Sequence, residues 1–136
     1  MNSDLKTVEY QLDNGLKVLF QTSHGLPSAT FMIWYKVGSR NEQEGKTGIS
    51  HFLEHLTFKS TEIFSTGQMT AEITRNGGTF NAYTSRDFTC FFETFATSKL
   101  ELAMLIESQR MHKLKIQKHE VEKEVGIVLA EIEKKS

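Results

Sequence analysis

The stretch Gly48-Ile-Ser-His51-Phe-Leu-Glu54-His55 lies in an apolar run that is compatible with a helix. On a helix with about 3.6 residues per turn, His55 lies about 40° round from His51, and Glu54 lies about 60° to the other side. All three side chains therefore project from one face. Two neutral imidazoles at this spacing can bind one Zn²⁺, and a carboxylate beside them can accept a proton from a water molecule on the metal.

This order of residues, H-x-x-E-H, is the reverse of H-E-x-x-H and is a signature of zinc peptidases. Any short motif also arises by chance. The competing interpretation is a partly buried amphipathic helix whose histidines bond to backbone groups or to acids. Because two histidines and a glutamate at metal-ligand spacing are seldom accidental, the pattern favours a metal site at His51 and His55.

The composition predicts one globular domain over residues 1–136. Apolar residues make up 38% of the chain, charged residues make up 24% and the net charge is −1, so nucleic acid is not expected as a partner. Cys90 is the one cysteine, which excludes an internal disulfide and a cysteine zinc cluster. The sequence has no apolar run that could span a bilayer and no signal-peptide pattern, so we expect a cytoplasmic protein without membrane insertion.

Alternating polar and apolar residues predict strands at 7–12 and 16–20. Asn14-Gly15 between them predicts a two-residue hairpin turn with positive φ at both positions. The segment 29–37 is aromatic and β-branched, with apolar residues on both faces. It is expected to form a central strand that is buried on both sides.

The helix that carries the motif is expected to begin at an N-cap, Thr47, and to end near Phe58. Capping-box patterns predict the starts of two further helices, and alternation predicts two more strands. These elements are a helix from Ser65–Gln68 to Asn76, strands at 79–85 and 88–96, a helix from Ser98–Glu101 to about Met111, and a last helix from about Gln117 onward.

The resulting order, βββααββαα, predicts an α+β fold. We expect a mixed, mostly antiparallel sheet of about five strands that is packed by about four helices. The bulky residues of 88–96 predict burial of that strand on both faces. No stop signal ends the last helix, so we expect the chain to be a fragment of a longer domain.

A catalytic zinc usually takes three protein ligands, and the two histidines supply two. The segment 117–136 offers carboxylates for the third position. Periodicity favours Glu124 or Glu131, because both border the apolar face of the last helix, and it does not choose between them. The competing interpretation of both residues is a solvated acidic edge.

Several segments together resemble the pitrilysin-like zinc peptidases, the family of the mitochondrial processing peptidase and insulin-degrading enzyme. The similarity is greatest to the processing-peptidase branch and covers nearly all of the chain. The matching segments are Asp13-Asn14-Gly15-Leu16, Gly38-Ser-Arg-Asn-Glu42, His51-Phe-Leu-Glu-His-Leu-Thr-Phe-Lys59, Gly77-Gly-Thr-Phe-Asn-Ala-Tyr-Thr-Ser85 and Glu122-Lys-Glu-Val-Gly-Ile-Val-Leu-Ala-Glu131.

The resemblance implies a role for each matched site residue. The zinc ligands would be His51, His55 and Glu131, and the general base would be Glu54. Glu124 would orient a ligand histidine or tune the charge of the metal. Asn81 and Ala82 would lie in an edge strand that pairs with an extended substrate through backbone hydrogen bonds.

The resemblance also implies a function, a zinc-dependent metalloendopeptidase that cleaves extended peptides, with Glu54 activating water. Members of the family are several times longer and close two halves around the substrate, so this chain would be the N-terminal part of a catalytic domain. We expect zinc binding with weak or absent peptidase activity for the chain alone. The alternative is a non-catalytic peptide-binding or scaffold fragment that needs a second half. A peptide or protein substrate is the expected partner, together with a second half-domain or a second copy of the chain.

Overall fold

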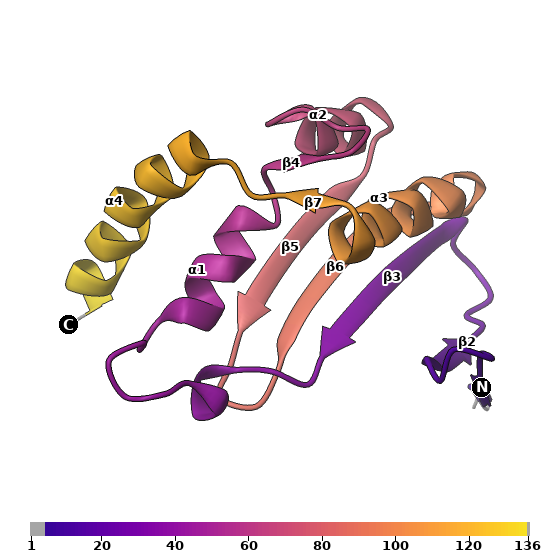
Figure 1. Ribbon diagram of the computed structural model, residues 1–136. Helices are drawn as coiled ribbons and strands as arrows, with labels where there is room; N and C mark the ends of the chain where they lie inside the picture. Colours follow the sequence, from indigo (N-terminus) through magenta and orange to yellow (C-terminus); the bar gives the residue numbers. More distant parts are fainter. Residues whose placement is uncertain (1–4, 136) are drawn as a thin grey trace.

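The computed structural model of the protein describes residues 5–135 and has the expected α+β architecture. Figure 1 shows the last helix beside the helix that carries the motif, and the first hairpin at the opposite end of the molecule. The elements are β1 (Thr7–Gln11), β2 (Lys17–Gln21), β3 (Ser28–Tyr35), α1 (Ile49–Leu56), β4 (Ser60–Thr61), α2 (Gln68–Arg75), β5 (Thr79–Thr84), β6 (Thr89–Ala96), α3 (Leu100–His112), β7 (Leu114–Lys115) and α4 (Lys118–Lys135), with 3-10 turns at Ser39–Asn41 and Thr97–Lys99.

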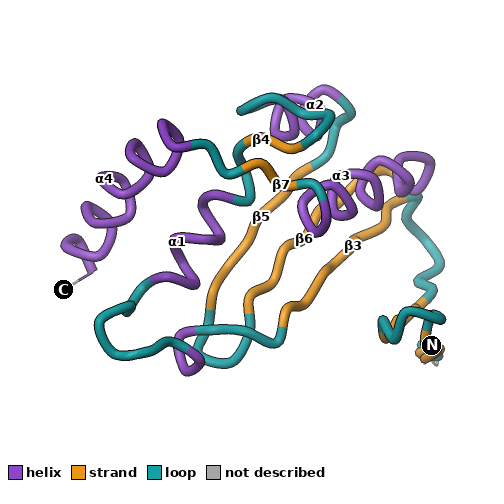
Figure 2. Tube along the Cα trace, viewed as in Figure 1, coloured by secondary structure: helices purple, strands orange, loops and turns teal. Residues whose placement is uncertain are grey.

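The principal sheet has three antiparallel strands in the order β3-β6-β5 (Figure 2). Strand β6 is central and is buried along most of its length, as expected for 88–96. Helix α3 packs on β3 and β6, while α1 and α2 pack on β5. The core between these layers consists of Phe64, Met69, Ile73, Phe95, Ala103 and Ile106.

Strand β3 differs from the expectation, because it lies at an edge of the sheet and is not buried on both sides. Its residues alternate between exposed and half-buried. Met32 and Trp34 remain 41% and 51% exposed on the face that no helix covers. Apolar residues on both faces of 29–37 therefore do not show that both faces are buried. The position of a strand in a sheet depends on which strands, distant in sequence, pair with it.

The first hairpin forms a separate two-stranded sheet, so the five long strands are divided between two sheets. Its turn is also different from the expected one. The Gly15 N–H donates to the Leu12 carbonyl at 2.8 Å, and the Leu12 N–H donates to the Leu16 carbonyl at 2.9 Å. Only Gly15 has positive φ (87°) in this turn, so the loop has three residues, and the two-residue turn at Asn14-Gly15 is wrong.

The capping boxes locate two helices but place their starts slightly too early. Helix α2 begins at Gln68, and the Gln68 side chain reaches back to the Ser65 N–H at 3.0 Å. Helix α3 begins at Leu100, after the 3-10 turn Thr97–Lys99. Within residues 5–135, the helices are all too short or too polar to cross a membrane.

Candidate metal centre

Helix α1 is fixed at its N-terminus by a carboxylate from the preceding loop. The Gly48 N–H donates to Glu42 Oε2 at 2.8 Å, and the Ser50 N–H donates to Glu42 Oε1 at 2.9 Å. Burial alone would raise the pKa of Glu42, but these hydrogen bonds outweigh it and lower the pKa below its ordinary value. Thr47 as the N-cap is therefore wrong, since Gly48 occupies that position and the side chain of Glu42 binds the free N–H groups.

Three predicted ligands converge between α1 and α4. His51 Nε2 and His55 Nε2 are 3.1 Å apart. Glu131 Oε2 lies 3.5 Å from His51 Nε2 and 3.6 Å from His55 Nε2. These three atoms are grouped closely enough to bind one metal ion, and each side chain remains partly exposed.

The spacing fits zinc. Tetrahedral zinc with bonds of about 2.0–2.1 Å holds its ligand atoms about 3.4 Å apart. The three observed separations lie within a few tenths of an ångström of that value. Two histidines and one carboxylate also match the donor set of a catalytic zinc, which leaves one coordination position for water or substrate.

Glu124 lies behind His55 and not among the three converging groups. Its Oε1 is 2.9 Å from His55 Nδ1, and its Oε2 is 2.6 Å from Lys59 Nζ. Burial alone would raise the pKa of Glu124, but the hydrogen bonds and charges of Lys59 and His55 lower it below its ordinary value. The structure thus separates the two glutamates that periodicity left equivalent.

Glu54 is buried and faces β5. The Thr84 hydroxyl donates to Glu54 Oε2 at 2.5 Å. The Thr89 hydroxyl lies 3.4 Å from the Thr84 oxygen and donates to the Val37 carbonyl at 2.9 Å. Thr84 on β5 therefore holds one carboxylate oxygen of Glu54. Glu54 itself lies on the same face of α1 as His51.

Asn81 and Ala82 lie on β5, which is an edge strand of the principal sheet next to α1. The Ala82 N–H donates to Asn81 Oδ1 at 2.9 Å, so it is not used in the ladder with β6. This N–H points to the free edge of the sheet. An extended chain pairing there would have to displace the Asn81 side chain.

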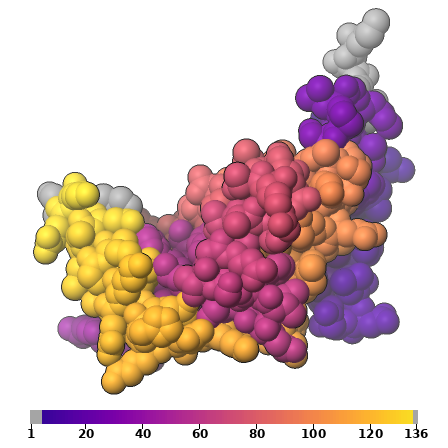
Figure 3. Space-filling view, turned by 90° about the horizontal axis from the view of Figure 1, so that it is seen from above, coloured from indigo at the N-terminus to yellow at the C-terminus, as the bar shows by residue number. Residues whose placement is uncertain are grey.

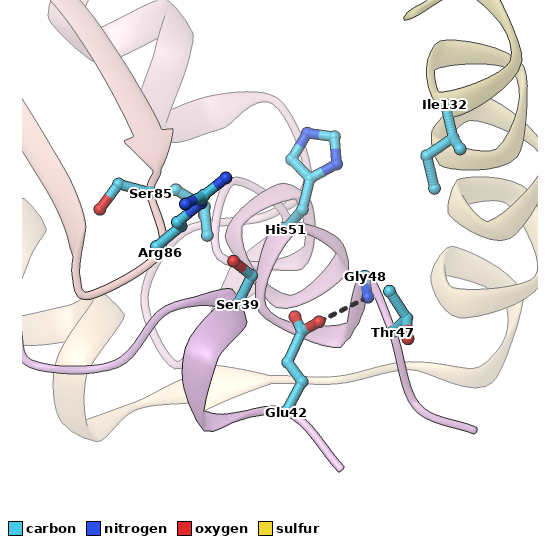
Figure 4. Close-up of a pocket in the computed structure, with 9 residues that line it drawn as sticks. Ser39, Glu42, Thr47, Gly48, His51, Ser85, Arg86 and Ile132 are labelled. Atoms are coloured by element: carbon cyan, nitrogen blue, oxygen red, sulfur yellow. Dashed lines mark hydrogen bonds between the residues drawn. The ribbon is translucent and has the colours of Figure 1, made fainter. Parts of the chain in front are cut away.

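A pocket of about 410 Å³ opens beside His51 (Figure 4). Its walls come from the 39–48 loop, from the turn after β5 and from α4. The lining residues are Ser39, Glu42, Thr47, Gly48, His51, Thr84, Ser85, Arg86 and Ile132. Seen from above, the surface is hollowed between α4, in yellow, and the rest of the molecule (Figure 3).

A buried ion cluster supports the C-terminal end of α1. The Arg110 guanidinium bonds to the carboxylates of Glu93 and Glu107, and its Nε donates to the Thr57 carbonyl at 3.3 Å. It also stacks on Phe58, with 4.7 Å between Cζ and the ring centroid. Burial, followed by the neighbouring Glu107, raises the pKa of Glu93 to about 9, although Arg110 opposes the shift.

Three polar residues at the site were not predicted as site residues. They are Glu42, Lys59 and Thr84, which act on the N-terminus of α1, on Glu124 and on Glu54. Each makes its contact across a loop or between elements, so helix or strand periodicity gave no signal for it. The capping preference for an acid near a helix N-terminus could have suggested Glu42.

Comparison with known proteins identifies the family. Residues 17–136 match the model of the insulinase family, peptidase family M16. The chain therefore belongs to this family, as its resemblance to the pitrilysin-like peptidases predicted.

The relatives are proteases of much greater length. An uncharacterized zinc protease of Streptomyces coelicolor is 36% identical over 121 residues, which cover 89% of this chain and 26% of that protein. The mitochondrial-processing peptidase subunit beta of Mus musculus is 36% identical over 122 residues, which cover 90% of this chain and 25% of the subunit. The crystal structure of a protease from Helicobacter pylori matches with a TM-score of 0.90 and 35% identity, over 93% of this chain and 30% of that one. The expected zinc cofactor agrees with the name of the Streptomyces protein.

Proposed function

We propose that this chain is the zinc-binding part of a metalloendopeptidase that cleaves extended peptides. The convergence of His51 Nε2, His55 Nε2 and Glu131 Oε2 carries the proposal, because their separations fit one tetrahedral metal. Membership of a peptidase family supports the same reaction. The chain corresponds to 25–30% of the length of the relatives described above, which supports the expectation that it works with a further half.

The site residues would have two roles, metal binding and proton transfer. His51, His55 and Glu131 would hold the zinc, which when bound makes water more acidic and polarises a carbonyl group. Glu54 would accept the proton of the attacking water and later pass it to the leaving amine. Because Oε2 of Glu54 is bonded to Thr84, the other oxygen is the one left to take the proton.

Substrate would bind along β5. The free edge strand can pair with an extended peptide through its backbone, with Asn81 and Ala82 beside the metal centre. Such pairing tolerates many side chains, so the substrate class is an extended peptide and not one sequence. A second half-domain or a second copy of the chain would complete the cleft. We also propose a cytoplasmic location.

The alternative function is a non-catalytic peptide-binding fragment. The same β5 edge would serve it, and the three converging ligands would be a remnant of the parent enzyme. Zinc binding together with cleavage separates the two functions, because peptide pairing at the edge strand requires neither.

The test combines zinc titration with cleavage of an unstructured peptide by the purified chain. We expect one zinc per chain, and at most slow cleavage, which stops when a chelator removes the zinc. Glu54→Gln is expected to keep the zinc and lose turnover, whereas His51→Ala is expected to lose both. His112→Ala, at the exposed end of α3, is the matched control and should change neither.

Each contrary result has a distinct meaning. Zinc binding without any cleavage would favour the peptide-binding alternative for the isolated chain. Cleavage by zinc-loaded Glu54→Gln would remove Glu54 from the role of base. A chain that binds no zinc at neutral pH would overturn the metal site itself.

A further inference from the structure

One cation lies directly behind the metal centre and has no part in the proposed function so far. Lys59 follows His55 by four residues, just beyond the C-terminal end of α1. Its position is fixed by the chain, because the Lys59 N–H donates to the Leu56 carbonyl at 3.0 Å and β4 begins at the next residue. Its Nζ reaches Glu124 Oε2 on α4 at 2.6 Å.

The carboxylate of Glu124 determines which nitrogen of His55 is free. A carboxylate only accepts hydrogen bonds, so the His55 Nδ1 that lies 2.9 Å from Glu124 Oε1 must carry the proton. The lone pair of His55 then lies on Nε2, the atom that converges with His51 and Glu131. This is the tautomer that a metal requires at that atom.

Glu124 can do this only if its carboxylate is held facing His55. Its side chain is 4% exposed, and burial of an unpaired carboxylate is costly. A neutral His55 donates one hydrogen bond and no charge. Lys59 provides the compensating charge, because its Nζ forms an ion pair with the second oxygen at 2.6 Å, while the first oxygen lies 2.9 Å from His55 Nδ1.

We propose that Lys59 is a positioning residue of the metal centre, which acts through Glu124 to hold His55 in the tautomer with a free Nε2. The inference rests on the proposed zinc site. His55, on α1, and Lys59, just after α1, both reach one carboxylate on α4, and α4 also carries Glu131. The contacts of Glu124 therefore also help to position Glu131, the third ligand, relative to the two histidines.

The test compares Lys59→Met, which keeps the length of the side chain, with Lys59→Arg, which keeps the charge. Nitrogen-15 NMR of the metal-free protein reports the tautomer of each histidine. We expect His55 in the wild type to carry its proton on Nδ1, and in Lys59→Met to become a mixture of tautomers. Zinc affinity, measured by competition with a chelating dye, should fall about 10-fold in Lys59→Met, as for other partners of metal ligands, and recover in part in Lys59→Arg.

Lys113→Met is the matched control, since Lys113 forms an ion pair at 2.9 Å with the exposed Glu62 and not with Glu124. It should leave the tautomer and the zinc affinity unchanged. An unchanged His55 tautomer in a folded Lys59→Met protein would overturn the proposal. The tautomer is read without metal, so a wild-type chain that binds no zinc would refute the zinc site and still leave Lys59 tested.

A second measurement uses the wild type alone, in case Lys59→Met does not fold. An ammonium group bonded to a buried carboxylate exchanges its protons slowly with water. The Lys59 ammonium is expected to give a resolved nitrogen-15 signal at neutral pH, while that of Lys113 exchanges too fast to be seen. A Lys59 ammonium that exchanges as fast as that of Lys113 would also overturn the proposal.

Discussion

At the scale of single residues, Glu42 makes the clearest contribution outside the metal ligands. It accepts hydrogen bonds from two N–H groups at the start of the helix that carries both histidines. Glu42→Ala leaves these groups without the carboxylate, and we expect it to lower the free energy of unfolding by about 1–2 kcal/mol at neutral pH. Urea denaturation followed by circular dichroism measures the change.

The pH dependence of this effect has a defined sign. The pKa of Glu42 is lower in the folded state than in the unfolded state, so its contribution is present above the unfolded pKa and is lost as the pH falls through the folded one. The difference between wild type and Glu42→Ala should therefore shrink in acid. Glu44→Ala, at an exposed loop position, is the control. An equal difference at pH 7 and at about pH 3 would contradict this account.

The sequence predicted those site residues whose relation is local. His51, Glu54 and His55 lie within a little more than one helical turn, so helical geometry alone places them on one face. Helical periodicity could not tell whether Glu124 or Glu131 is the third metal ligand. That depends on the position of α4 along the axis of α1. The family resemblance assigned Glu131 to the metal, and the structure brings Glu131, and not Glu124, to the two Nε2 atoms.

At the scale of elements, α4 contains a glycine with no evident structural use. Gly126 has ordinary helical φ, is exposed, and would place an added Cβ in open space. Gly126→Ala is therefore expected to stabilise the protein by about 0.5–1 kcal/mol, because alanine loses less backbone entropy in a helix. Thermal unfolding measures the gain.

Gly38 provides the opposite case for the same substitution. An added Cβ there would lie 2.4 Å from the Ser85 carbonyl oxygen, so Gly38→Ala should destabilise the protein. The close approach joins the loop before α1 to the turn after β5, where the Ser39 N–H also donates to the Ser85 carbonyl.

If Gly126→Ala were destabilising, α4 would need a contact at that position that the structure does not show.

Patterns in the sequence predict which elements exist better than they predict how the elements assemble. Helix and strand periods and turn residues located α1 to α4 and the long strands, since these signals depend on neighbours in the chain. The edge position of β3 and the separation of the first hairpin from the principal sheet were not predicted. Both depend on which distant segment pairs with which, and no period in 29–37 encodes that.

At the scale of the whole molecule, the buried cluster of Glu93, Glu107 and Arg110 makes stability depend on pH. Two carboxylates share one guanidinium, and burial with the neighbouring Glu107 raises the pKa of Glu93 to about 9. A raised folded pKa means that stability is complete below the unfolded pKa and declines as the pH rises toward the folded one. The wild type should lose on the order of 4 kcal/mol between about pH 5 and pH 8.

Glu93→Gln removes the titrating group and keeps the shape of the side chain. We expect it to flatten the dependence of stability on pH in this range and to be more stable than the wild type at pH 8. Glu101→Gln, on the exposed side of α3, serves as the control and should follow the wild type. Parallel curves for wild type and Glu93→Gln would show that Glu93 does not hold its proton in the folded protein.

The attachment of α4 has a consequence for the dynamics of the chain. Among the described elements, α4 makes its principal contacts with α1, and the residues that link them are far apart in sequence, 69 positions for His55 and Glu124. A metal ion shared by the two helices would act as a cross-link that closes this long loop, comparable in the chain-entropy model to a disulfide that contributes about 4 kcal/mol. The contacts of Glu124 with His55 and Lys59 need no metal, so removal of the metal would weaken the attachment of one helix and not melt the whole molecule. Amide hydrogens of α4 would exchange with solvent long before those of β6.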